Sequence, residues 1–436
     1  MITKMFHAMT IPSLRLLIAT LMLLAWCAPA MADETGMPIR GIVIDGLKRT
    51  QPRTVLRELP FGQGDVWTER DAPEAERRLR NLGLFSNVTV SPPDADGQVH
   101  ILVQERWAIW LLPEISRHDN GDTSAGVTFT DYNLWGLRHQ VRLAYRRDTG
   151  KNFGGGASGT SYQSSYLWRR INDSKWDLDL HGTRGRQIFD AYSNGVVQSQ
   201  YLSNVDNTGL ALHYTFGPVP GEGTTATIGF DDTNTKYTLL GGPVQPDVLG
   251  QRRHALTLGI DYQFLDDNIT WLIGRRMGYS LNVAHKALGS SIQVYRQTAY
   301  YRDYYELSGQ KTLNLRLDGG IASGDVLRDG LFDIGGGSNV RGYVAGELQG
   351  SAYLEGGIES RVPLEFNSNL QWVAFTDMGY LARKAQASNS KSFAVGTGTG
   401  VRWTLRWLVN GIIRADVAYG WNTRKWRFYL GTGQAF

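Results

Sequence analysis

The sequence predicts an all-β transmembrane barrel of 16 antiparallel strands, preceded by one small α+β domain. From residue 107 to the end, apolar and polar residues alternate with a period of two, as they do in strands that separate two environments. Glycine (51 residues), tyrosine (20) and tryptophan (13) are abundant, which is typical of many strands with tight turns and aromatic girdles. Beyond the N-terminal segment, no apolar run is long enough for a helix to cross a bilayer.

Residues 1–32 are predicted to be a secretory signal peptide. Their only charges are Lys4 and Arg15, and an uncharged run follows that ends in Ala30-Met31-Ala32, a small-x-small cleavage pattern. A membrane anchor is the alternative, but the run is short for a span and its small, proline-containing end suits cleavage better. The only cysteine, Cys27, lies in this segment. Cleavage after Ala32 would leave no thiol, which excludes disulfides and thiolate chemistry.

The net charge excludes one class of partner. The chain carries 45 basic and 41 acidic residues, so it has no strong field to attract nucleic acid, and we expect no nucleic-acid partner.

Residues 37–106 are predicted to form the small domain, in the order β-α-α-β-β. The pattern predicts strands and helices over Ile39–Thr50, Pro52–Leu59, Glu69–Asn81, Asn87–Ser91 and Gln98–Glu105. This is enough chain for one small domain.

Residues 107–436 are predicted to form the barrel. Leu313, Leu315 and Leu317, for example, alternate with Asn314, Arg316 and Asp318. A soluble sandwich would show the same period, but the charge density and glycine content of the polar face favour a lumen. We expect strands beginning near residues 107, 123, 138, 160, 175, 205, 224, 252, 276, 290, 311, 351, 370, 393, 412 and 426. An even number suits a closed antiparallel barrel.

One long glycine-rich interval, at about residues 323–350, interrupts these strands. It contains Gly335-Gly336-Gly337-Ser338-Asn339-Val340-Arg341-Gly342-Tyr343. Its glycines match neither dinucleotide nor P-loop patterns. A long loop in a compact barrel is usually functional, although a plain surface loop with a solvated Arg341 is the alternative.

Residues 37–106 resemble a POTRA domain, the periplasmic module of certain outer-membrane proteins. The matching residues are Gly46-Leu47, Leu56 to Leu59, Gly64-Asp65, Leu84-Phe85-Ser86-Asn87-Val88 and Glu105. Each piece is short, and their order and spacing carry the resemblance.

The rest of the chain resembles the bacterial surface antigen superfamily, which includes barrel-assembly factors and two-partner secretion transporters. The residues that carry it are Val340-Arg341-Gly342-Tyr343, Glu359 to Leu364, Phe375 to Gly379 and Gly433 to Phe436. The resemblance implies that the loop after the eleventh strand folds into the lumen. It also implies that Arg341 pairs with Asp377 of the thirteenth strand, and we expect Tyr343 beside them.

Strand parity adds to these expectations. Asp377 alternates with the apolar Trp372 and Met378, so it faces the lumen, and Glu359 and Arg361 share one face of the preceding strand. The C-terminal Phe436, on an amphipathic last strand, resembles the signal by which outer-membrane barrels are recognised for assembly.

The resemblance implies an insertase or translocase in the outer membrane, with the POTRA domain in the periplasm. Its partners would be the lipid bilayer and a client polypeptide or lipid, and we expect a monomeric barrel. A passive channel or structural surface antigen is the alternative. An enzyme is not expected, because neither G-x-S-x-G nor H-E-x-x-H occurs, and we expect no cofactor and no metal. The family's members usually carry more POTRA domains than the one recognised here, which leaves the client open.

Overall fold

The structure is a computed structural model that describes residues 36–433, except 118–122, 151–157, 194–195, 218, 220–221, 345–347 and 383–390. The expected signal peptide (1–32) and Phe436 lie outside the described residues. No helix in the described part of the chain is long and apolar enough to cross a membrane.

The N-terminal domain has the predicted β-α-α-β-β order. Its elements are β1 (Gly41–Asp45), α2 (Pro52–Leu56), α3 (Asp71–Asn81), β2 (Phe85–Ser91) and β3 (Gln98–Glu105). The central strand is β3, which pairs in parallel with β1 and antiparallel with β2. Val55 of α2 and Ala75 and Leu79 of α3 are fully buried in one core with Val99 and Ile101 of β3. The helices therefore cover one face of the sheet.

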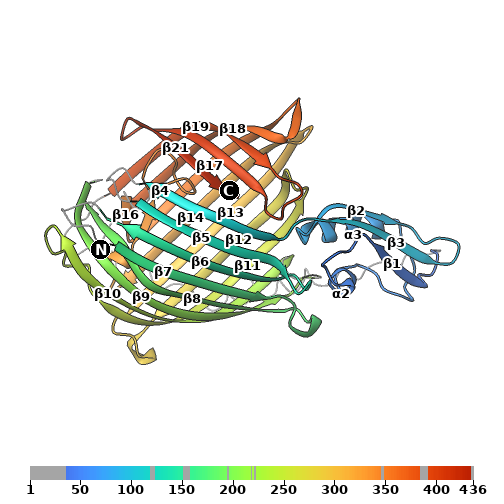
Figure 1. Cartoon of the computed structure of the whole chain (residues 1–436), viewed down its shortest axis with the longest axis horizontal. Coiled ribbons are helices and arrows are strands. Elements are labelled where there is room, and N and C mark those ends of the chain that lie inside the picture. Colours follow the sequence, from blue (N-terminus) through green and yellow to red (C-terminus); the bar gives the residue numbers. More distant parts are fainter. Residues whose placement is uncertain are drawn as a thin grey trace, which may run out of the picture.

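The rest of the chain forms one 16-stranded sheet, and both the number and the antiparallel pairing of the strands were predicted correctly. The strands in sheet order are β4 (Ile109–Arg117), β5 (Thr123–Leu134), β6 (His139–Thr149), β7 (Ser158–Trp168), β8 (Trp176–Ser193), β9 (Val196–Thr215), β10 (Gly223–Gly241), β11 (Gln251–Asp267), β12 (Leu272–Ala284), β13 (Val294–Ser308), β14 (Lys311–Gly324), β17 (Ala352–Leu364), β18 (Asn367–Ala382), β19 (Lys391–Thr404), β20 (Ile412–Gly420) and β21 (Lys425–Thr432). The sheet curves around a lumen, with the N-terminal domain at one end (Figure 1).

The alternation of residues separates two surfaces. In β14, Leu317 and Ile321 are about half exposed on the outer face, whereas Asn314 and Arg316 are buried in the lumen. The same division holds for Trp372 and Asp377 of β18. An apolar outer face and a charged inner face are the arrangement that a membrane barrel requires.

The sheet is not closed, so the expectation of a closed barrel was wrong. Among the described residues no ladder joins β4 to β21, and these two strands are the edges of the sheet. At the POTRA end of this seam, Trp107 forms a bridge with Leu408, and the indole of Trp110 donates to the carbonyl of Val409 at 2.7 Å. Alternation specifies which face a residue takes, but it carries no information about the pairing of the first and last strands.

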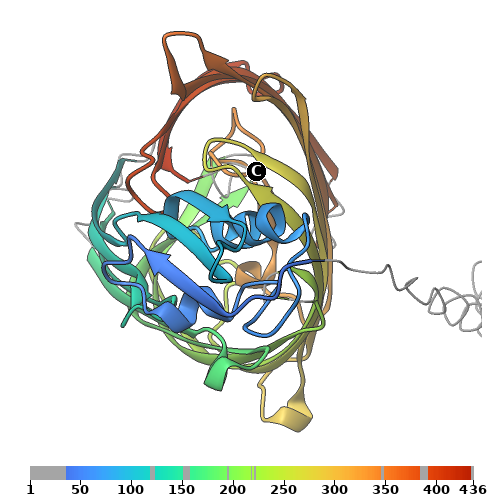
Figure 2. The ribbon, with the colours of Figure 1, turned by 90° about the vertical axis from the view of Figure 1, so that its right-hand side faces the viewer.

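The interval between β14 and β17 contains a two-stranded hairpin, β15 (Phe332–Ile334) paired with β16 (Leu348–Gly350). Short 3-10 turns occur at η2 (Ile171–Asp173), η3 (Lys286–Leu288) and η4 (Arg328–Gly330). The N-terminal domain lies across the mouth of the sheet at the end of the turns that precede β6, β8, β10 and β12 (Figure 2).

Candidate functional site

The glycine-rich loop after the eleventh strand, β14, is packed inside the lumen. Val340 and Tyr343 are buried together with Ile334 of the hairpin, and all three rest on Leu381 of β18 and Ala394 of β19. This small apolar core fixes the loop against the wall formed by the C-terminal strands.

Arg341 is the centre of a buried ionic network. Its Nε donates to Asp377 Oδ2 at 2.7 Å and its Nη2 donates to Asp377 Oδ1 at 3.1 Å, a two-pronged contact that suits the planar guanidinium. Its Nη1 donates to Glu359 Oε2 at 2.8 Å and lies 3.6 Å from Asp416 Oδ2. The structure therefore brings Arg341 and its expected partner Asp377 together. The Arg341 side chain is only 1% exposed, so the pair is shielded from water.

Glu359 links Arg341 to two further arginines. It accepts from Arg361 Nε at 2.8 Å and from Arg402 Nη2 at 2.9 Å, and Arg402 also donates to Asp416 at 2.6 Å. The centre of the network contains Arg341, Arg361, Arg402, Glu359, Asp377 and Asp416. Arg316 joins it, with Nη2 4.0 Å from Asp377 Oδ1 and Nε 3.8 Å from Asp318 Oδ2. Each of these buried ions therefore lies beside a charge of opposite sign.

The aromatic partner of Arg341 differs from the expected one. The ring below its guanidinium belongs to Phe375 of β18, at 3.3 Å from the ring centroid. Tyr343 instead directs its hydroxyl to the wall, where it donates to Asn422 Oδ1 at 2.6 Å. Phe375 shares the inward parity of Asp377, so the sequence contained a signal for this contact. The direction of Tyr343 depends on the loop backbone, which parity does not describe.

Two glycines allow the loop backbone to lie directly on the wall. Gly342 has φ of +103°, in the region that glycine adopts without strain. Gly396 of β19 faces the carbonyl of Arg341, which a Cβ at this position would approach to 1.7 Å. A side chain at Gly396 would therefore displace the Arg341 backbone from its place beside Asp377.

Further residues hold the loop, and the sequence alone did not single them out for that role. Tyr429 of the edge strand β21 accepts from the Gly342 amide and donates to the Tyr343 carbonyl, both at 2.9 Å. Arg414 of β20 donates to the Gly337 carbonyl at 2.8 Å, and Arg316 of β14 donates to the carbonyls of Ser338 and Asn339. The loop thus braces the wall from β14 to the seam.

A second ionic contact joins the N-terminal domain to the sheet. Arg170, in the turn before β8, donates to both oxygens of Glu58 at 2.9 and 3.2 Å, and both side chains are less than a tenth exposed. Beside it, Arg57 pairs with Asp173 at 3.1 Å, but Asp173 is about half exposed.

The same domain is held on other parts of the rim. Arg77 of α3 pairs with Glu222 at 2.8 Å, and Arg80 pairs with Asp266 at 3.2 Å. Burial opposes the charged form of Arg77, but its hydrogen bonds to Glu74 and Glu222 raise its pKa above the ordinary value. At the seam, burial lowers the pKa of Arg106 to about 10, so its guanidinium remains charged at neutral pH and donates to the Arg406 carbonyl at 2.9 Å.

The described residues define a class of protein: an outer-membrane barrel of 16 strands with a small periplasmic domain and a lumen-inserted loop. The chain belongs to the Omp85 superfamily, whose domain model matches residues 133–436. A POTRA model, described as a surface antigen variable number repeat, matches residues 37–106. The chain is therefore an outer-membrane protein with its POTRA domain in the periplasm, and the resemblance of the sequence to this superfamily is confirmed.

Two curated relatives are described as outer membrane protein assembly factor BamA. The one from Neisseria meningitidis is 36% identical over 99 residues, which is 23% of this chain and 12% of that protein. The one from Neorickettsia risticii is 25% identical over 197 residues, 44% of this chain and 23% of that protein. The matched region thus spans less than a quarter of each relative.

Solved structures show the same fold at low identity. CdiB from Escherichia coli has a TM-score of 0.63 at 13% identity, with 92% of this chain and 74% of that chain covered. CdiB from Acinetobacter baumannii gives 0.60 at 16% identity, with 90% and 72% covered. BamA from Haemophilus ducreyi lacking POTRA domains 1–3 gives 0.53 at 16% identity, with 91% and 83% covered.

Proposed function

We propose that this protein inserts client polypeptides into the outer membrane, or exports them across it, by capturing an extended segment on the POTRA domain and passing it to the seam between β4 and β21. The observation that carries the proposal is the seam itself. Unpaired strand edges are templates for the addition of another strand. A client strand that pairs there would satisfy backbone groups that the sheet leaves open in a membrane, where each unsatisfied group is costly.

Two further features support a route through the seam rather than through the lumen. The loop around Arg341 is packed against the inner wall, and the POTRA domain lies across the periplasmic mouth. A passive channel would need an open path at both places. Because Glu359, Asp377 and Asp416 are paired with arginines, we assign them a structural role and propose no catalytic reaction. We also propose that the protein acts as a single barrel.

The POTRA sheet has two outer edges, one on β1 and one on β2, and the edge of β2 is the better candidate for client capture. The Val90 amide donates to Glu76 Oε1 of α3 at 3.0 Å, so it points away from β3. Because amides alternate along an antiparallel strand, the Val88 amide points to the same edge. An extended client would accept a hydrogen bond there and lie in the angle between β2 and α3.

Val88→Pro tests this capture. Proline removes the outward donor but is tolerated on an edge strand when its position faces away from the ladder. We expect client crosslinks to the POTRA domain to fall about tenfold, because the client loses roughly one hydrogen bond to this edge. Val88→Ala is the control, because it also disturbs the packing of the buried valine, by removing two methyl groups, but keeps the amide. Equal crosslinking in the two variants would rule out capture at this edge.

A further inference from the structure

The outer wall of β8, β9 and β10 changes its chemistry at one height. On β8, Trp176, Leu178 and Leu180 share the outward face, and Arg184 and Arg186 follow on that same face. The neighbouring strands change in register with it. The rows across β8, β9 and β10 read Leu180–Leu210–Phe230, Gly182–Thr208–Asp232, Arg184–Asp206–Asn234 and Arg186–Asn204–Lys236. The apolar band therefore ends at the row of Asp232, and the cations lie in the two rows beyond it.

The height of these cationic rows matches the outer boundary of the bilayer. Trp176 follows the periplasmic turn whose Asp173 contacts the POTRA domain. The roughly 10 residues from Trp176 to Arg186 span about 33 Å along a strand. With the usual tilt of about 40°, this is about 25 Å of height, which is the height of the apolar band of such barrels. Arg186 thus lies where the headgroups of the outer leaflet begin.

The cations line a hollow of about 460 Å³ on this wall. Arg184, Arg186 and Lys236 surround it together with the uncharged Asn204 and Asn234. Arg184 lies 3.8 Å from Asp206, and both side chains are largely exposed. No ion pair joins Arg186 or Lys236 to another residue in the part of the chain that the structure describes. Arg147, opposite Thr160 of the same hollow, adds a further exposed cation.

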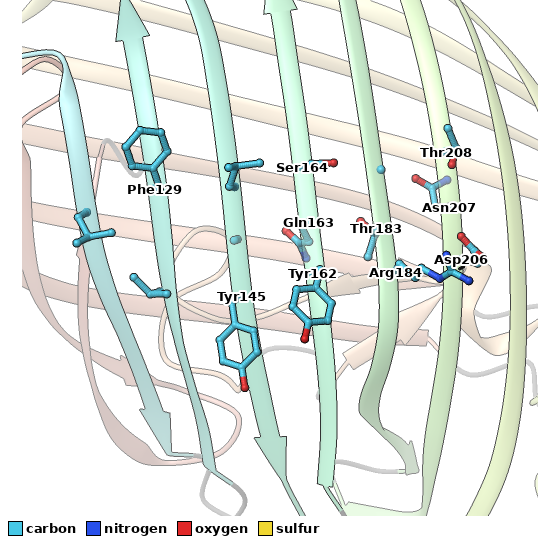
Figure 3. A pocket seen from close by; sticks show the side chains of 15 residues that line it. Phe129, Tyr145, Tyr162, Gln163, Ser164, Thr183, Arg184, Asp206, Asn207 and Thr208 are labelled. Carbon is cyan, nitrogen blue, oxygen red and sulfur yellow. Dashed lines mark ion pairs between the residues drawn. The ribbon is translucent and has the colours of Figure 1, made fainter. Parts of the chain in front are cut away.

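A second, apolar hollow of about 590 Å³ adjoins the first on its membrane side. It is lined by Leu143, Tyr145 and Tyr162, and the two tyrosine rings lie 5.5 Å apart. Arg184 and Asp206 line both hollows, so the two are continuous. Figure 3 shows Tyr145 and Tyr162 side by side and Arg184 extending toward Asp206 on the next strand.

We propose that the two hollows together bind one phosphorylated glycolipid of the outer leaflet, with its phosphate on Arg186 and Lys236 and an acyl chain along Tyr145 and Tyr162. Guanidinium and ammonium groups are the usual protein donors to phosphate. The order of the hollows, apolar toward the bilayer centre and cationic at its surface, matches an anionic amphiphile inserted in the outer leaflet. Cations spread over strands about 5 Å apart suit a headgroup that carries more than one phosphate.

This inference does not depend on the proposed client. It assigns the outer wall from β4 to β10 as the place where a lipid of the surrounding leaflet is held, with the cationic hollow on β7 to β10 and the apolar hollow extending to Leu111 of the edge strand β4.

The test is a lipid titration of the full-length protein in detergent, followed by native mass spectrometry. The probe is lipid A with two phosphates, compared with dephosphorylated lipid A and with phosphatidylcholine. Arg186→Gln/Lys236→Gln removes the two cations that have no ion-pair partner among the described residues. Arg424→Gln/Lys425→Gln is the control, because it removes two exposed cations at the same end of the sheet, at the start of β21.

We expect the patch variant to bind lipid A at least tenfold more weakly, and the control variant to bind it as the native protein does. Arg186→Lys/Lys236→Arg should restore binding, because it keeps both charges. Dephosphorylated lipid A should bind the native protein as weakly as lipid A binds the patch variant, and millimolar inorganic phosphate should not compete. Equal binding by the patch and control variants would overturn the proposal. So would equal binding of phosphatidylcholine and lipid A, or full competition by free phosphate.

Discussion

Arg341→Ala is expected to release the loop from the lumen wall while the sheet still forms. The substitution leaves Asp377, Glu359 and Asp416 buried with one guanidinium fewer. Breaking a buried ion pair by removing one partner costs about 3–5 kcal/mol. The ladders of the sheet are unaffected, so the loss falls on the docking of the loop. Cleavage around Gly335–Tyr343 by a nonspecific protease should accelerate about a hundredfold or more, and complementation of a depletion strain should fall.

Asp377→Ala should be milder than Arg341→Ala. It leaves Arg341 with Glu359 at 2.8 Å and Asp416 at 3.6 Å, so the remaining guanidinium keeps two carboxylates.

The control for Arg341→Ala is Arg275→Ala. It removes an arginine that is also 2.7 Å from its carboxylate, Asp303, but is about half exposed. Because Arg275 is exposed, its loss should affect stability much less than the loss of Arg341. If Arg341→Ala and Arg275→Ala gave the same protease pattern, the network would not be what holds the loop.

Glu58→Ala is expected to loosen the POTRA domain from the periplasmic mouth. Arg170 would remain buried without the carboxylate that it contacts through two nitrogens, at a cost of about 3–5 kcal/mol. Hydrogen exchange reports this directly, because the Gln51 amide donates to the Gly136 carbonyl across the interface. We expect peptides covering residues 51–58 to exchange at least tenfold faster.

Asp173→Ala provides the matched control at the same interface. Asp173 pairs with Arg57, which is adjacent to Glu58 in the chain. Because Asp173 is about half exposed, removing its carboxylate should weaken the docking of the domain by about 1 kcal/mol or less. If exchange were unchanged in Glu58→Ala, or equally fast in both variants, the buried pair would not be the contact that docks the domain.

The sequence was sufficient for the features that depend on the alternation of residues. It predicted the 16 strands, the place of the loop after the eleventh strand and the inward direction of Asp377. It placed the start of the sixth barrel strand near residue 205, whereas β9 begins at Val196. The reason is that β8 and β9 extend beyond the apolar band, where apolar residues lie on both faces (Ile188 opposite Leu202 and Phe189 opposite Tyr201), so the alternation disappears.

Other features depend on the curvature of the sheet, which a single strand does not encode. Arg341 meets carboxylates from β17, β18 and β20, and only their separate inward parities can be read from the sequence. The contact of Arg170 with Glu58 joins residues 112 positions apart in two domains. The open seam also could not be predicted from single strands, because the alternation in β4 and β21 is compatible with a closed or an open sheet.

Locking the seam between β4 and β21 tests most directly whether clients pass through it. Leu112 of β4 and Thr432 of β21 line one hollow of about 320 Å³ between the two edges, and Cys27 is the only native cysteine. A Leu112→Cys/Thr432→Cys protein would be joined by a reducible bismaleimide, with Val141→Cys/Tyr166→Cys, opposite each other on β6 and β7, as the control. The readout is the outer-membrane and secreted proteomes of a depletion strain that carries each protein. We predict loss of client proteins with the seam joined, recovery on reduction and no effect of the control crosslink, whereas normal proteomes with the seam crosslink intact would rule out a route through the seam.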